Sequence, residues 1–98
     1  MARIVWTMRA ADEFEEAAKY VAQHAPVAAR RLAQRIMRRI RSLRKHPDSG
    51  GFVPEDPTGR YRQLIEGNYR IIFRRNKDAV VIASIFHGAR LLRPDDLP

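Results

Sequence analysis

The stretch that decides the fold runs from Arg60 to Arg90 and reads RYRQLIEGNYRIIFRRNKDAVVIASIFHGAR. Two turn signals, Gly67-Asn68 and Asn76-Lys77-Asp78, separate runs that are rich in β-branched and aromatic residues. This pattern predicts three antiparallel strands joined by short turns, the first of them over residues 60–66. The last run, Ala79–Phe86, is apolar on both alternations, which is typical of an interior strand that is covered on both faces.

The Gly67-Asn68 turn predicts the register of the first hairpin, because a two-residue loop pairs the residues on either side of it. In that register Leu64 faces Ile71, Arg62 faces Phe73, and Ile65 faces Arg70. One face of the hairpin is then apolar and is expected to pack on helices: Leu64, Tyr69, Ile71 and Phe73. The other face mixes apolar residues with arginines: Tyr61, Gln63, Ile65, Arg70, Ile72 and Arg74.

Two helices are predicted upstream of these strands. Ala2–Trp6 is short and β-branched and is expected to be a strand, after which Thr7 offers its side-chain oxygen as the N-cap of a helix over residues 8–24. Pro26 suits the first turn of a second helix, over residues 26–45. The connection between the helices is so short that an antiparallel hairpin is expected.

The first of these helices carries a cluster of acids, Asp12, Glu13, Glu15 and Glu16. We interpret the cluster as a solvated helix face, because side chains at adjacent helical positions splay apart rather than converge. The second helix is strongly basic: Arg30, Arg31, Arg35, Arg38, Arg39, Arg41, Arg44 and Lys45. Three interpretations stay open for it, namely direct nucleic-acid contact, a surface covered by an acidic protein, and a solvated face neutralised by the acids of the first helix.

The 98 residues are expected to form one domain, residues 1–98, with a short tail at about residues 91–98 whose last five residues are expected to be extended. The expected class is α+β: an N-terminal strand, an antiparallel helical hairpin, and a three-stranded antiparallel sheet. The sequence holds no cysteine, which excludes disulfides and thiol catalysis. The chain start has neither a signal peptide pattern nor a membrane-spanning pattern, so a cytoplasmic protein without membrane contact is expected.

The net charge of +8 and the pI of about 11.0 indicate an acidic or polyanionic partner. The loop His46–Gly59 joins the basic helix to the strands, and Phe52 and Val53 are expected to pin it to the core. Within this loop, Glu55 and Asp56 are the acids closest in sequence to the arginine-bearing strands.

Two residues of the opening stretch could carry chemistry. Arg70 projects from a strand on the same face as Arg74, and such a face could hold a phosphate and stabilise charge in a transition state. His87 directly follows the last strand and could act as a general acid or base. The predicted nucleic-acid contacts are Arg60, Arg62, Arg74 and Arg90, and the predicted partner contacts are Arg31, Arg35, Arg38 and Arg39. The sequence has no metal-ligand spacing and no phosphate-binding glycine loop, so neither a metal nor a cofactor is expected.

The predicted order of elements, with Trp6-Thr7 opening the first helix, resembles the RelE/ParE family of toxins from type II toxin–antitoxin systems. The resemblance rests on Arg62-Gln-Leu64, on Gly67-Asn-Tyr69-Arg70-Ile-Ile-Phe73, and on His87-Gly-Ala-Arg90. It covers the chain from Arg3 to about Arg90. It implies a small toxin that is neutralised by a cognate antitoxin, with the helical hairpin and the sheet as the seat of that antitoxin.

This family contains two activities. RelE-like members cleave messenger RNA on the ribosome, whereas ParE-like members poison DNA gyrase and are not nucleases. Arg70 matches the strand arginine of the ribonuclease members, and Glu55 is a possible match to a loop glutamate that some members use, but the ending His87-Gly-Ala-Arg90 is more similar to the ParE branch. The resemblance therefore implies a gyrase inhibitor, with a ribosome-dependent endonuclease as the alternative. A basic binding module without toxicity is a second alternative.

Overall fold

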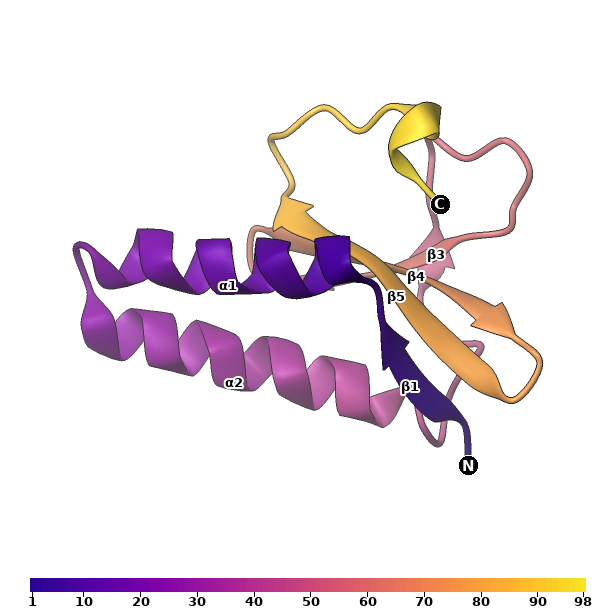
Figure 1. Ribbon diagram of the computed structural model, residues 1–98, viewed down its shortest axis with the longest axis horizontal. Coiled ribbons are helices and arrows are strands. Elements are labelled where there is room, and N and C mark those ends of the chain that lie inside the picture. The colour runs from indigo at the N-terminus through magenta and orange to yellow at the C-terminus, as the bar shows by residue number, and fades with distance from the viewer.

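A five-stranded sheet and two helices make up the computed structural model, which describes residues 1–98 apart from the side chain of Pro94. The helices α1 (Met8–Ala22) and α2 (Pro26–Ser42) run side by side as a hairpin along the sheet (Figure 1). The strands are β1 (Arg3–Trp6), β2 (Gly51–Phe52), β3 (Arg62–Glu66), β4 (Tyr69–Asn76) and β5 (Ala79–His87). The predicted α+β class is confirmed.

The sheet has the order β1-β5-β4-β3-β2, which is two strands more than the predicted three. β1 is a parallel partner of β5, from Arg3 opposite Ala79 to Trp6 opposite Ile82. β2 adds two residues to the outer edge of β3. The predicted register of the β3–β4 hairpin is confirmed, since Leu64 pairs with Ile71 in an antiparallel ladder.

Both helices end earlier than predicted. Thr7 caps α1 as expected, because its side-chain oxygen accepts the Ala10 N–H at 3.0 Å. α1 ends at Ala22 and α2 ends at Ser42, a few residues before Pro26 and Pro47 respectively. A proline disfavours helical geometry in the residue that precedes it, so neither helix can run up to its proline. No helix in the described part of the chain is long and apolar enough to cross a membrane.

Two apolar clusters cover the two faces of the sheet, so β5 is buried on both sides as predicted. The larger cluster lies between the sheet and the helices: Ala10, Leu32, Ile36, Ile40, Leu43, Leu64, Ile71, Phe73, Val80, Ile82 and Ile85. The smaller cluster lies under the loop before β3 and the tail: Val53, Tyr61, Ile72, Ala83, Phe86 and Leu92. Figure 1 shows that loop and tail meeting away from the helices.

Two expectations about the connecting segments were wrong. Phe52 does not pin its loop to the core, because it is 75% exposed while Val53 is buried; neighbouring residues of an extended chain point to opposite sides. The tail is not simply extended, since it forms a short 3-10 helix, Pro94–Asp96, and buries Leu92. The sheet face opposite the helices is therefore largely covered by the chain itself.

Candidate functional site

Arg70 is the centre of a hydrogen-bonded cluster on the sheet face that the loop covers. Its guanidinium donates to both carboxylate oxygens of Glu55, at 2.6 and 2.7 Å, and its Nε donates to Gln63 Oε1 at 2.8 Å. The guanidinium carbon also lies 5.2 Å from the centroid of the Phe86 ring, in reach of a cation–π interaction. The Arg70 side chain is only 12% exposed, so its hydrogen-bonding edge and one planar face are occupied by protein groups.

The loop residues Glu55 and Asp56 are both held as carboxylates. The hydrogen bonds from Arg70 lower the pKa of Glu55, because they favour the charged form of the acceptor. The Thr58 hydroxyl, 2.6 Å from the Asp56 oxygen, is the largest cause of a lowered pKa at Asp56, which also accepts the Tyr61 N–H at 2.8 Å. Glu55 thus fastens the loop to β4 while Asp56 closes the loop on itself.

His87 ends β5 directly opposite Tyr69, with the two rings edge to face at 5.5 Å between centroids. Its Nδ1 accepts the Ala89 N–H at 3.1 Å. Successive residues of a strand alternate between faces, so His87 and Tyr69 face the helix side whereas Arg70 and Phe86 face the loop side. The two predicted catalytic side chains, Arg70 and His87, thus project from opposite faces of the sheet, although both residues line a pocket of about 380 Å³ beside the Gly67-Asn68 turn.

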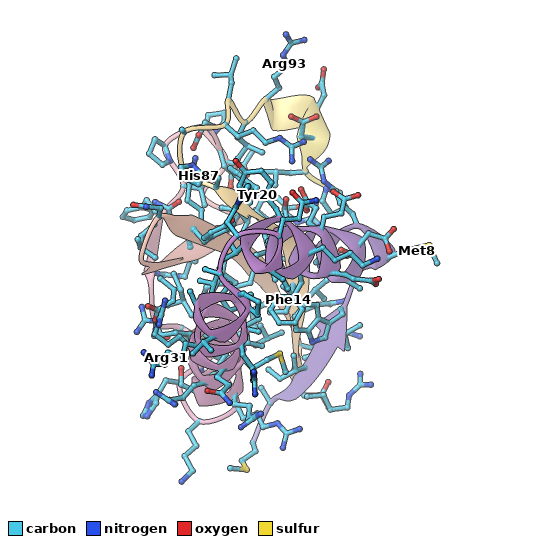
Figure 2. All side chains as sticks on the ribbon, turned by 90° about the vertical axis from the view of Figure 1, so that its left-hand side faces the viewer. Met8, Phe14, Tyr20, Arg31, His87 and Arg93 are labelled. Carbon is cyan, nitrogen blue, oxygen red and sulfur yellow. The ribbon has the colours of Figure 1, made fainter. Side chains whose placement is uncertain are left out.

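A groove of about 380 Å³ opens beside His87, between the second half of α1 and the end of β5. Figure 2 shows Tyr20 and His87 close together on this side of the molecule. Tyr20 is 67% exposed, and the rest of the lining combines aromatic and aliphatic surface with a charged rim: Glu13, Glu16, Ala17, Tyr69, Ile85, Phe86 and Arg90. A concave apolar centre with a polar rim is the anatomy of a protein-binding site.

Glu13 is a residue of this groove that the sequence analysis placed on a solvated face. Its side chain is 12% exposed and accepts hydrogen bonds from the Ser84 hydroxyl at 2.7 Å, the Ile85 N–H at 3.2 Å and Arg90 at 2.8 Å. β1 pairs with β5 only as far as Trp6 opposite Ile82, so it does not reach Ile85. The Glu13 carboxylate therefore accepts the Ile85 N–H in place of a neighbouring strand. The available signal was its position, three residues after Ala10 on the apolar stripe of the helix.

The four arginines that were predicted to contact nucleic acid are dispersed. Arg60 is exposed beside Tyr61, and Arg90 is paired with Glu13. Arg62 lies opposite Phe73 on the helix side and donates to the Gly50 carbonyl at 3.3 Å. Arg74 follows Phe73 in the same strand and so projects from the other face.

The four arginines that were predicted to bind a partner protein fall into two pairs. Arg35 and Arg39 approach Glu66 at the end of β3, at 3.4 and 4.0 Å, and so connect α2 to the sheet. Arg31 and Arg38 are exposed, and among the described residues no carboxylate lies within ion-pair distance of them.

Comparison with known proteins agrees with the fold. Residues 4–92 match the family model described as "ParE toxin of type II toxin-antitoxin system, parDE". The chain is 34% identical over 92 residues to Toxin RelE2 of Caulobacter vibrioides, a match that covers 93% of this chain and 100% of the relative. A structure titled "Chromosomal ParDE TA system from P. aeruginosa" superposes with a TM-score of 0.76 at 22% identity, covering 89% of this chain and 96% of that chain.

Proposed function

Since the chain belongs to the RelE/ParE family of toxins from type II toxin–antitoxin systems, we propose that it acts as ParE-like toxins do, by contact with DNA gyrase. A cognate antitoxin neutralises it. On this proposal the chain arrests growth by inhibiting a partner enzyme and does not itself catalyse a reaction.

The occupied guanidinium of Arg70 is the observation that carries this proposal. A residue that stabilises a phosphoryl transition state must direct free donors at the place where charge develops. The Nε, Nη1 and Nη2 groups of Arg70 each donate to Glu55 or Gln63 instead, and the His87 side chain projects from the other face of the sheet. An arginine held in this way supports the loop and the fold, which favours inhibition by protein contact.

The groove beside Tyr20 supports the proposal that a protein partner binds on the helix side of the sheet, opposite to Arg70. Exposed aromatic residues that flank a pocket are frequent anchors of protein–protein interfaces. Tyr20 offers such an anchor, while Glu16 and Arg90 supply charges of both signs at the rim. We assign this groove to the antitoxin, whose presence there would cover the same aromatic surface that a target enzyme could use.

The direct test adds the purified chain to DNA gyrase and a plasmid substrate. The expected result is a dose-dependent loss of supercoiling and an accumulation of cleaved DNA, both reversed by the cognate antitoxin. In cells, induction should produce DNA damage while messages stay intact. Unimpaired supercoiling at a large excess of toxin would overturn the gyrase proposal.

Ribosome-dependent cleavage of messenger RNA is the second candidate, and it is favoured by the similarity to a relative named Toxin RelE2. In this alternative Arg70 contacts the phosphate and His87 transfers the proton. Rapid message cleavage on ribosomes, abolished by Arg70→Ala and increased by Glu55→Gln, would establish it. If expression of the chain does not arrest bacterial growth at all, both toxin proposals fail and a non-toxic basic binding module remains.

A further inference from the structure

The outer face of α2 is a row of arginines that the fold does not use. The buried residues of this helix, Ala29, Leu32, Ile36 and Ile40, define its inner face. At 100° per residue, four arginines fall on the opposite side, and all of them are exposed; we call Arg30, Arg31, Arg38 and Arg41 the outer row.

The acids of α1 do not neutralise the outer row. Glu15 pairs with Lys19 within α1 at 2.9 Å, and Glu13 is taken up by Arg9 and Arg90. Among the described residues, Glu66 is the only acid within ion-pair distance of an α2 arginine, and it engages Arg35 and Arg39 instead. Figure 2 shows Arg31 pointing away from α1. The structure thus argues against the interpretation of a solvated face that is balanced by its neighbour.

The outer row is also extended. It spans twelve residues of a continuous helix, from Arg30 to Arg41, which is about 16 Å at 1.5 Å per residue. Arg31 and Arg38 are two turns apart, at about 10 Å. Positive charges repeated along a helix suit a ligand whose negative charges are also repeated, as duplex DNA presents along its backbone.

The chemistry of this face distinguishes duplex DNA from the other acidic ligands. A protein interface needs apolar anchors at its centre, and Val27 is the single large apolar residue that α2 exposes in the described structure. Single-stranded RNA is held largely by stacking on aromatic side chains, and α2 contains no aromatic residue. Arginine forks without apolar anchors or aromatic platforms suit contacts to the phosphate oxygens of a duplex, which carry no sequence information.

We propose that the outer row of α2 binds the phosphate backbone of duplex DNA without sequence preference. The binding is independent of the action on gyrase, because the groove beside Tyr20 lies on the far side of α1 from Arg31 (Figure 2). The proposed role of this binding is to hold the toxin on DNA, where DNA gyrase also binds.

The test measures binding of the isolated chain to a fluorescent 30-base-pair duplex by anisotropy over a series of salt concentrations. The decisive variant is Arg31→Gln with Arg38→Gln. Its matched control, Arg3→Gln with Arg93→Gln, removes the same charge from exposed positions outside α2. Thermal unfolding of all three proteins checks that each variant is folded.

The outer-row variant is expected to bind more weakly, and the slope of log K against log salt should fall in magnitude by about 1.8, or about 0.9 for each lost phosphate contact. The control should keep the slope of the unaltered chain. Equal losses in the two variants would reduce the effect to net charge and overturn the proposal. Preferential binding of single-stranded RNA, or no duplex binding at low salt, would overturn it as well.

Discussion

Glu55→Gln tests whether the pair of Glu55 and Arg70 holds the loop before β3 on the sheet. The substitution keeps the shape of the side chain but removes its charge and one of the two acceptor contacts with Arg70. Loss of a hydrogen bond to a charged group costs about 1.5–3 kcal/mol, whereas an exposed ion pair is worth about 0–1 kcal/mol. The Arg70 side chain is 12% exposed and that of Glu55 is 24% exposed, so we expect a loss of about 2 kcal/mol, near the lower half of the first range.

The pH dependence of this loss has a definite sign. Hydrogen bonds from Arg70 lower the pKa of folded Glu55 from its ordinary value of 4.5. A lowered folded pKa gives stability that is complete above the unfolded pKa and is lost as the pH falls through the folded pKa. Glutamine does not titrate, so the difference in unfolding free energy between the variant and the unaltered chain should be complete well above pH 4.5 and should narrow as the pH falls below it.

Urea denaturation followed by circular dichroism at pH 7 and pH 3 measures both effects. A loss of about 2 kcal/mol corresponds to a melting temperature lower by about 8–16 °C in a domain of this size. Glu15→Gln is the matched control, because the pKa of Glu15 is also lowered, by Lys19, but the pair is exposed; its midpoint should stay close to that of the unaltered chain. Equal midpoints for the two variants at pH 7 would refute the reasoning. A gap between the Glu55→Gln variant and the unaltered chain that does not narrow from pH 7 to pH 3 would refute it as well.

Three further predictions address the backbone, the tail and the groove. Gly50→Ala should cost about 2 kcal/mol of unfolding free energy, because Gly50 has a φ of +91° and a Cβ there would lie 2.6 Å from the Gln63 carbonyl oxygen; Gly51→Ala, with open space around its Cβ, is the control in the same urea titration. Leu92→Ala should cost about 2 kcal/mol, at the low end for a buried leucine because a chain end can relax, and an unchanged midpoint would show that the tail is not part of the core. Tyr20→Ala should leave the melting temperature unchanged but weaken antitoxin binding about 30-fold in calorimetry, as expected for loss of an interface anchor of about 2 kcal/mol; full retention of affinity would remove the antitoxin from the groove.

The features that the sequence predicted well are those that local chemistry decides. Gly67 has a φ of +58° in the turn between β3 and β4, which glycine adopts at little cost, and this turn sets the register of the hairpin. Thr7 and Pro26 mark the two helix starts for reasons that involve only neighbouring residues. Each of these signals lies within a few residues of the structure that it predicts.

The features that were missed depend on partners far apart in the sequence. β1 pairs in parallel with a strand that begins 76 residues later, and no local pattern indicates that neighbour. In the sequence, Glu13 is one of four clustered acids that indicate a solvated helix face. Only its contact with β5 in the structure shows that it accepts the Ile85 N–H. The tail offered no periodic pattern at all, yet Leu92 completes a core cluster with Phe86.

Arginine content illustrates the same difference at the functional sites. In the sequence, Arg70, Arg35 and Arg31 carry the same guanidinium, and only their predicted strand or helix distinguishes them. The structure separates them by what they already bind: Arg70 makes a two-pronged pair with Glu55, Arg35 links α2 to Glu66, and Arg31 belongs to the outer row. An arginine that is paired within the fold has fewer donors left for a ligand. The surface that suits a polyanion is therefore the one formed by the arginines that have no partner inside the described structure.

The separation of the outer row from the groove has a consequence for the neutralised complex. A partner anchored at Tyr20 and His87 contacts the upper side of α1, and Arg31 of the outer row points away from that side of the hairpin (Figure 2). Antitoxin binding in the groove would therefore block contact with gyrase without covering Arg31 or Arg38. On these proposals the toxin keeps its affinity for the DNA backbone in the complex, so the outer-row variant should reduce the salt-dependent DNA binding of the toxin–antitoxin complex as well as that of the toxin alone.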